Sequence, residues 1–255
     1  MYTKTVIVFL LMIIILAIVL ALILTKDEDI GDFNIKYVGN AKNYQSIINQ
    51  GVNRWSSIGV KGIYIEFRTV SNLSGNVLAS TLGNVVTLSQ QRFDSGLSTN
   101  IKILTIAHEV GHALGIGAWN DSSVLTESST NQLYLSNNNF PKTAKAYVDN
   151  VRPSGITLVG APIESQSSLG SGSYKVHWEN NPSYGMQKDL MVYNINASSN
   201  IISIIDLTYL HEIGREVDLS QAQSLKGSFS SVISEYIFAE DKTEYRCGTC
   251  ENHKK

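Results

Sequence analysis

The chain has 255 residues, and its 20 Lys and Arg against 22 Asp and Glu give a formal net charge of −2. Nucleic-acid binding draws most of its affinity from an excess of cationic side chains, so this balance argues against a nucleic-acid partner. Hydrophobic residues make up 43% of the sequence, which is enough apolar surface to build a core and excludes a wholly disordered chain.

The N-terminal segment is a candidate membrane anchor. The 19 residues from Val6 to Leu24 are uncharged and almost wholly apolar, and a helix of that length spans about 28 Å, close to the thickness of the bilayer interior. We therefore expect residues 1–26 to form an N-terminal transmembrane helix, with residues 27–255 on the outside of a single-pass membrane protein. A cleaved signal peptide, and hence a secreted protein, is the alternative, although signal peptides have shorter apolar regions.

The segment that follows predicts alternating strands and helices. Sequence runs typical of strands occur three times, at Phe33–Val38, Gly62–Arg68 and Asn84–Ser89. Apolar residues at helical spacing predict two amphipathic helices, at Ala41–Ile58 and at Ser98–Leu114 with Ser98 or Thr99 as N-cap. We expect an upper lobe with a small twisted sheet under two helices, which makes the fold α+β.

Beyond Gly115 the composition becomes polar, and we expect a loop-rich lower lobe with a C-terminal helix. The predicted elements there are a helix at Phe140–Asn150, irregular chain at Ile156–Gly172, a helix at Ile201–Glu216 and a weak strand or helix at Phe229–Tyr236. We place the folded domain at residues 27–240 and a C-terminal tail at 241–255. In that tail Cys247 and Cys250 fit a disulfide or free thiols better than a zinc knuckle, because even with His253 they supply fewer than four ligands.

The most informative stretch is AHEVGHALG, residues 107–115. His108 and His112 lie four residues apart, so a helix places both imidazoles on one face, where they can hold one metal ion. Glu109 lies about 100° away around the helix and can reach a water held by that metal. A zinc ion with three protein ligands keeps a position for water and lowers the pKa of that water to about 7, so Glu109 can act as general base.

The third metal ligand is not fixed by this stretch. In the long zincin motif it comes six residues after the second histidine, but that position is Ala118, which cannot bind metal. The remaining candidates are histidines and carboxylates further along the chain: His177, His211, His253, Glu212 and Glu216. The stretch HEIG at residues 211–214 imitates the start of the zinc motif, but Arg215 stands where the second histidine belongs, so we interpret His211 as part of a packing helix.

Four segments together resemble the leishmanolysin-like branch of the metzincin zinc endopeptidases: HEVGHALGIGAW, HWE, DLMVY and EIGREVD. The resemblance covers about residues 63–218 and implies a zincin fold of the metzincin type, in which an insertion displaces the third histidine. It implies His108, His112 and His177 as zinc ligands, Glu109 as catalytic base, and Met191 in a turn beneath the metal. The chain departs from the family pattern in having no cysteine in its core, none ahead of the site, and Asp189 where Glu is usual.

Two further expectations concern substrate binding. Some metzincins place a tyrosine two residues after the methionine of this turn, where it hydrogen-bonds the oxyanion, so Tyr193 is a second candidate catalytic residue. The resemblance also implies that Asn84–Ser89 is the edge strand of the sheet, to which an extended peptide can add by main-chain pairing.

We therefore expect a membrane-anchored endopeptidase that uses Zn2+ and cleaves peptide or protein substrates. Two alternatives stay open at this point. One is a zincin whose third ligand is a carboxylate, such as Glu212 or Glu216. The other is an inactive surface binding module that keeps the zincin fold, although the intact Glu109 argues against it. The sequence does not indicate an oligomeric state.

Overall fold

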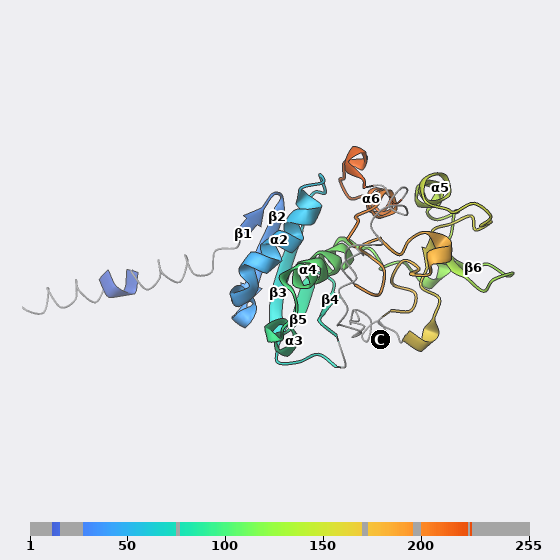
Figure 1. Cartoon of the computed structure of the whole chain (residues 1–255). Helices are drawn as coiled ribbons and strands as arrows, with labels where there is room; N and C mark the ends of the chain where they lie inside the picture. Colours follow the sequence, from blue (N-terminus) through green and yellow to red (C-terminus); the bar gives the residue numbers. More distant parts are fainter. Residues whose placement is uncertain are drawn as a thin grey trace, which may run out of the picture.

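The computed structural model describes residues 12–15, 28–74, 77–169, 173–195, 200–223 and 225. Over these residues the fold is a mixed α+β arrangement of two sheets and several helices, as predicted (Figure 1). Residues 12–15 are helical, whereas the rest of the predicted anchor, the segment 229–236 and the tail 241–255 lie outside the described residues. No helix in the described part of the chain is both long and apolar enough to cross a membrane.

The upper lobe is built on a five-stranded sheet with the strand order β1-β2-β3-β5-β4. Its strands are β1 (Glu28–Ile30), β2 (Phe33–Val38), β3 (Tyr64–Val70), β4 (Ala79–Leu82) and β5 (Val85–Ser89). β2, β3 and β5 run parallel, and β1 and β4 pair antiparallel at the two edges. The three predicted strands are confirmed. β1 and β4 are not predicted, because one has only three residues and the other, ASTL, has little β-branched content.

The expectation that residues 84–89 form the sheet edge is wrong. β5 lies between β3 and β4, because a two-residue turn at Gly83 and Asn84 folds β4 back against it. The edge strand on this side of the sheet is therefore β4. β4 also contacts α4 through Thr81, whose hydroxyl bonds to Glu109.

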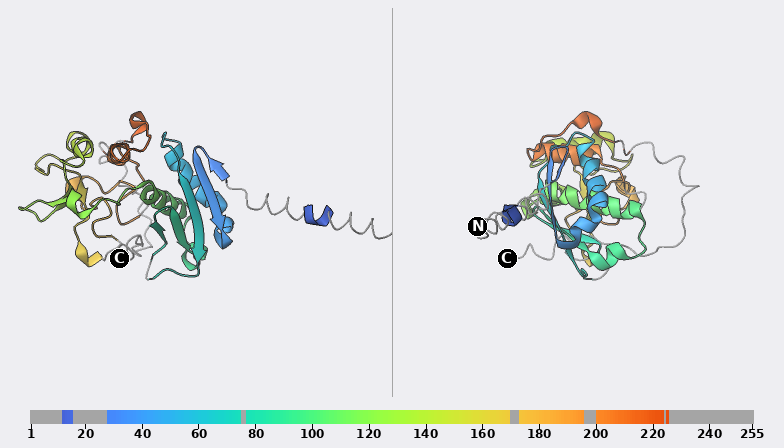
Figure 2. Two further views of the ribbon diagram at one scale, coloured as in Figure 1. Left: turned by 180° about the vertical axis from the view of Figure 1, so that it is seen from behind. Right: turned by 90° about the vertical axis from the view of Figure 1, so that its left-hand side faces the viewer.

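Two helices cover one face of the sheet (Figures 1 and 2). α2 (Gln45–Ser56) follows a 3-10 turn at Gly39–Tyr44, and α4 (Thr99–Leu114) follows the short α3 (Gln90–Asp94). α2 and α4 approach closely at Gly51, where a Cβ atom would meet the Ile106 side chain at 2.4 Å. Trp55 is fully buried at this contact and donates its Nε1 proton to Ala107 O at 2.7 Å. α2 therefore holds the central part of α4 in place.

The sheet has one apolar face because its side chains alternate. Along β2, Phe33 and Ile35 are buried, whereas Asn34 and Lys36 are exposed. This alternation is what a sheet covered on one side by helices requires. The core of the upper lobe consequently lies between the sheet and the pair α2 and α4.

The lower lobe consists mainly of loops around a small antiparallel sheet of β6 (Val124–Thr126), β7 (Leu133–Leu135) and β8 (Pro162–Ile163). Two helices, α5 (Pro141–Asn150) and α6 (Ile204–Glu212), pack against each other (Figure 1). Short 3-10 turns occur at residues 121–123, 167–169, 182–184 and 219–221. The helix predicted at 140–150 is confirmed. The small sheet is not predicted, because strands of two or three residues leave no periodic pattern.

α6 is shorter than the helix predicted at residues 201–216. Ser203 caps its N-terminus by accepting hydrogen bonds from two amides of the first turn, and the Asp206 carboxylate accepts one from Ser203 N. This reciprocal capping box starts the helix at Ile204. The helix ends ahead of Gly214, whose φ of 88° lies in the left-handed region.

Candidate metal centre

α4 carries two of the predicted ligands on its buried C-terminal part. Ser98, one of the two predicted caps, accepts a hydrogen bond from Ile101 N at 3.3 Å. Every residue from Leu104 to Leu114 is buried, so His108 and His112 face the interior. The two rings lie one helical turn apart, with their centroids separated by 4.7 Å, as the spacing of the sequence motif predicts.

His177 from the lower lobe forms a cluster with His108 and His112. The Nε2 atom of His108 lies 3.1 Å from that of His177 and 3.1 Å from that of His112, and the remaining distance is 3.2 Å. A tetrahedral zinc ion with Zn–N bonds of about 2.0–2.1 Å separates its ligand nitrogens by about 3.3–3.4 Å. Within the described ranges, these three buried histidines are therefore a group that could hold one metal ion.

Hydrogen bonds on the far side of each ring fix which nitrogen carries the proton. Each Nδ1 atom faces a main-chain carbonyl oxygen: His108 and Leu190 at 2.7 Å, His112 and Ile116 at 2.8 Å, His177 and Ser173 at 3.3 Å. A carbonyl oxygen only accepts, so each neutral ring carries its proton on Nδ1 and directs its Nε2 lone pair at the other two rings. Three lone pairs that face one another repel unless a cation lies between them, so this arrangement suits a metal site.

Burial keeps the three imidazoles neutral. Desolvation lowers the pKa of His112 to about 4 and lowers the pKa values of His108 and His177 well below the ordinary value. Repulsion from neighbouring imidazoles adds to the pKa decrease at His108 and His177. Because neutral imidazole is the form that ligates a metal, the burial favours metal binding.

Glu109 lies on α4 beside the first histidine and is fully buried. Thr81 on the edge strand β4 donates its hydroxyl proton to Glu109 Oε2 at 2.7 Å, and its oxygen also lies 3.1 Å from Glu109 O. Thr81 therefore holds one carboxylate oxygen of Glu109 against the edge of the sheet. The sequence analysis does not single out Thr81, because a threonine within an unpredicted four-residue strand gives no signal.

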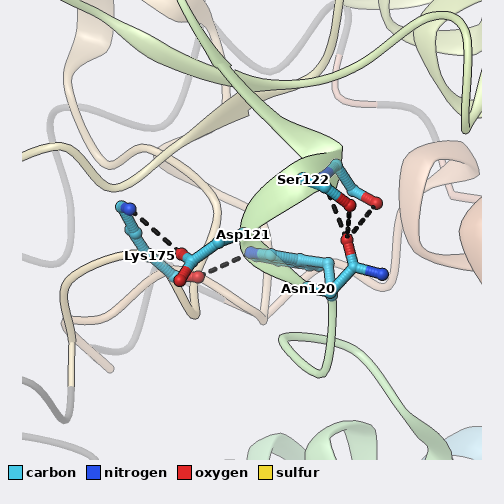
Figure 3. A network of polar contacts seen from close by, with 6 residues as sticks. Asn120, Asp121, Ser122 and Lys175 are labelled. Carbon is cyan, nitrogen blue, oxygen red and sulfur yellow. Dashed lines mark hydrogen bonds and ion pairs between the residues drawn. The ribbon is translucent and has the colours of Figure 1, made fainter.

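The segment that carries His177 is fastened to the chain that follows α4. Trp119 Nε1 donates to Lys175 O at 2.5 Å, and Lys175 Nζ pairs with the Asp121 carboxylate at 3.1 Å. Figure 3 shows Lys175 directed at Asp121, next to the turn that the Asn120 side chain closes. These contacts bring the third histidine to the end of α4 although 65 residues separate it from the second.

A glycine makes this approach possible. Gly117 has a φ of 88°, and a Cβ atom there would lie 2.4 Å from Val176 O and 3.1 Å from His112 Nδ1. Any side chain at this position would push the segment ahead of the third histidine away from the second. The GIG sequence after the zinc motif therefore has a steric reason.

Met191 is fully buried and lies against α4. A Cβ atom at Gly111 would come within 2.4 Å of Met191 Sδ and 2.9 Å of the Trp55 ring. Met191 N donates to Asp189 Oδ1 at 2.7 Å, and Met191 O accepts from Trp178 N at 3.1 Å. The turn at Met191 thus packs on the zinc-motif helix and is bonded to the segment that carries the third histidine.

Two buried carboxyl groups support this turn. Asp189 and Asp206 are fully buried, and Asp206 accepts from Trp178 Nε1 at 2.7 Å and from Ser203 N at 2.9 Å. Burial raises the pKa of Asp206 to about 6. Burial and the adjacent charge of Asp206 raise the pKa of Asp189 well above its ordinary value. Two such carboxyls side by side favour keeping one proton.

The carboxylate alternative for the third ligand does not gain support from the position of Glu212. Its Oε1 accepts from Lys142 N at 2.9 Å, and its Oε2 accepts from Thr143 N at 2.9 Å and from Thr143 Oγ1 at 2.7 Å. These bonds satisfy the first amides of α5, so Glu212 caps that helix.

The remaining predicted residues are not part of the histidine cluster. His211 and Glu216 are exposed, and His253 lies outside the described residues. Tyr193 is half-buried, two residues beyond Met191. Its part in stabilising an oxyanion stays a prediction.

Comparison with known proteins adds no relative. No protein-family model, curated protein or solved structure matches the chain.

Proposed function

We propose that this protein is a zinc-dependent endopeptidase of the metzincin type. The observation that carries the proposal is the cluster of three buried imidazoles whose Nε2 atoms lie 3.1–3.2 Å apart and whose Nδ1 atoms each face a main-chain carbonyl oxygen. Glu109 follows the first of them on the same helix. The buried Met191 against that helix, and the resemblance of the four sequence segments, support the same proposal.

The proposed reaction is peptide hydrolysis, with His108, His112 and His177 holding the ion. A zinc ion at such a site polarises a carbonyl group and makes water a nucleophile at neutral pH. Glu109 accepts the proton of the attacking water and delivers it to the leaving nitrogen of the peptide bond. Thr81 keeps the Glu109 carboxylate in position, and Tyr193 donates a hydrogen bond to the developing oxyanion.

The edge position of β4 suggests how a substrate binds. An edge strand presents unpaired main-chain groups, to which an extended peptide can add as a further strand. β4 also carries Thr81, so a peptide on this edge lies near the general base. This favours extended segments of peptides or unfolded proteins as substrates.

The test is cleavage of a mixed peptide library by the purified full-length chain, with and without 1,10-phenanthroline. We expect about one zinc per chain, and chelation should abolish cleavage. Glu109→Gln should retain zinc and lower the cleavage rate by about 100-fold or more. Glu216→Gln is the matched control, because that side chain is exposed, and it should cleave like the wild type. A zinc-loaded wild type that cleaves no peptide would favour the inactive binding module.

We further propose that the apolar run at residues 6–24 holds the peptidase in a membrane, with residues 27–255 on the outside. The length and uncharged character of the run support this proposal. Alkaline carbonate extraction of membranes from cells that express the full-length chain should leave the protein in the pellet. Recovery of a soluble chain whose N-terminus follows the apolar run would instead establish the secreted alternative.

A further inference from the structure

We propose that the lower lobe contains a second metal site, an oxygen-ligand site for Ca2+ formed by Glu164 and Glu179 together with Ser165 and Gln132. It shares no residue with the histidine cluster. The inference does not depend on the proposed peptidase activity, because it rests on a separate set of buried side chains.

The local main chain brings the two glutamates together. Ile163 at the end of β8 forms an antiparallel bridge with Trp178, and hydrogen bonds of 2.9 Å from Glu164 N and 3.1 Å from Glu179 N flank this bridge. Residues on either side of a bridged pair point to the opposite face of the pleat from the pair itself. Glu164 and Glu179 therefore lie on the same face, and the charge of one acts on the other.

Both carboxylates are removed from solvent, and one of their oxygens lacks a partner. Glu164 is 0% exposed and Glu179 is 2% exposed. Glu164 Oε1 accepts from Gln166 N at 2.8 Å, and Glu179 Oε1 accepts from Asn181 N at 3.0 Å. Glu164 Oε2 is buried without a hydrogen-bond partner in the described part of the chain. An ionised carboxylate left in this state is costly unless a cation or a proton compensates it.

The neighbouring polar groups add acceptors rather than donors. The Ser165 hydroxyl lies 3.2 Å from Glu179 Oε2 and 3.4 Å from Gln132 Oε1, but it has one proton for these two acceptors. Gln132 Nε2 donates to Leu133 O at 2.9 Å and to Ile163 O at 2.7 Å, which leaves its oxygen facing the serine. The amides of Ser165 and Asn180 also face the Glu164 carboxylate, but among the side chains of the cluster the buried acceptors outnumber the donors.

An oxygen-seeking cation satisfies this excess. The available ligands are carboxylate, amide and hydroxyl oxygens, with no nitrogen or sulfur, which is the donor set that Ca2+ prefers and completes with carbonyls and water. Glu164 N also donates to His177 O at 2.9 Å, and Glu179 lies two residues beyond His177. A cation bound here therefore stabilises the segment that carries the third histidine.

The experiment measures calcium binding and thermal unfolding of the full-length, zinc-loaded chain. We expect equilibrium dialysis with radioactive Ca2+ to give one bound ion per chain. Millimolar CaCl2, at about a hundredfold excess over the dissociation constant, should raise the unfolding midpoint by about 5–10 °C. Glu164→Gln and Glu179→Gln should each abolish this rise while zinc content stays at one. Glu127→Gln, a half-exposed glutamate of the same lobe, is the matched control and should keep the full rise.

Two results would overturn the proposal. If the wild type binds no calcium and Glu164→Gln is simply more stable at neutral pH, the site holds a proton. If a second equivalent of ZnCl2 stabilises the wild type more than CaCl2 does, the site is not one for a hard cation. Dialysis of the wild type decides the matter even if both variants fail to fold. A protein that binds calcium but cleaves no peptide would refute the proposed function and leave this site intact.

Discussion

The two lobes bury their polar groups in different ways. Outside the zinc motif, the buried polar side chains of the sheet and of α4 are hydroxyls: Thr81, Thr87, Ser89 and Thr105. The lower lobe also buries hydroxyls, but adds a set of ionisable groups: Glu164, His177, Glu179, Asp189 and Asp206. The upper lobe thus presents two histidines and a glutamate on a helix held by apolar packing. The lower lobe presents the third histidine through a polar network that includes buried carboxyl groups with raised pKa values.

The largest effect should come from removing the one ligand that the lower lobe supplies. His177→Ala leaves two imidazoles, and we expect the affinity for zinc to fall by more than about 100-fold, since even supporting residues contribute 10–100-fold. Competition with a chromogenic chelator measures this affinity. His211→Ala, at an exposed position, should leave it unchanged. Equal zinc affinity in His177→Ala and wild type would move the third ligand to another residue and revive the carboxylate alternative.

The second prediction concerns the proton held by the lower lobe. Because the pKa values of Asp189 and Asp206 are raised in the folded state, with Asp206 at about 6, the folded state binds protons more tightly than the unfolded one. This pair therefore contributes less stability as the pH rises from about 4 through 6 and above. Asp189→Asn removes a carboxyl group that must take up a proton on folding, and it keeps the acceptor for Met191 N. It should raise the free energy of unfolding near neutral pH by on the order of 1–3 kcal/mol.

Urea unfolding at several pH values checks this prediction. The difference in the free energy of unfolding between variant and wild type should grow with pH. The buried histidines contribute in the opposite direction, because their lowered pKa values favour folding as the pH rises. Both proteins share this contribution, so it cancels in the difference. Asp149→Asn, at an exposed position, is the matched control. A loss of stability in Asp189→Asn at neutral pH would mean that the pKa of Asp189 is not raised in the folded state.

A smaller effect is expected where the upper lobe supports the general base. Thr81→Val removes the hydroxyl that donates to Glu109 Oε2, and we expect kcat to fall by about tenfold, the equivalent of one ordinary hydrogen bond. Thr81→Ser keeps the hydroxyl and should retain most of the activity. Zinc content should be unchanged in both variants. A rise in KM alone, with kcat unchanged, would argue that Thr81 contacts substrate instead.

The smallest effect should come from the ion pair between Lys175 and Asp121. The Asp121 side chain is 89% exposed, so the pair is screened by water and salt. Lys175→Met should lower the free energy of unfolding by less than about 1 kcal/mol, and the difference should shrink at high ionic strength. A larger loss that is independent of salt would show that this contact, rather than the buried carboxyls, fastens the third histidine.

Features that depend on local sequence signals could be predicted, whereas features that depend on pairing between segments could not. The cap at Ser98, the helical period and the HEVGH spacing are local signals, so α4 and its two ligands follow from a few turns of sequence. β4 and its Thr81 do not, because a four-residue strand is defined by its pairing with β5 rather than by its composition.

The third ligand, like β4, depends on contacts between distant segments of the chain, which a local sequence pattern does not contain. His177 lies 65 residues beyond His112, and the residues alone leave His211, Glu212 and others open. The buried state of Asp189 and Glu164 is equally hidden, because a carboxylate in a loop is usually solvated. Only the folded chain shows that the segment at Glu164 bonds to His177 O, and that Trp178 N bonds to Met191 O, with Met191 against α4.

The carbonyl groups behind the three imidazoles have a consequence for metal affinity and selectivity. Leu190, Ile116 and Ser173 come from different stretches of chain, and together they keep all three rings in the orientation that ligation requires. Little rotational freedom is left to lose when an ion arrives. The folded protein should therefore bind metal tightly and discriminate by radius, binding ions with longer bonds to nitrogen more weakly than zinc.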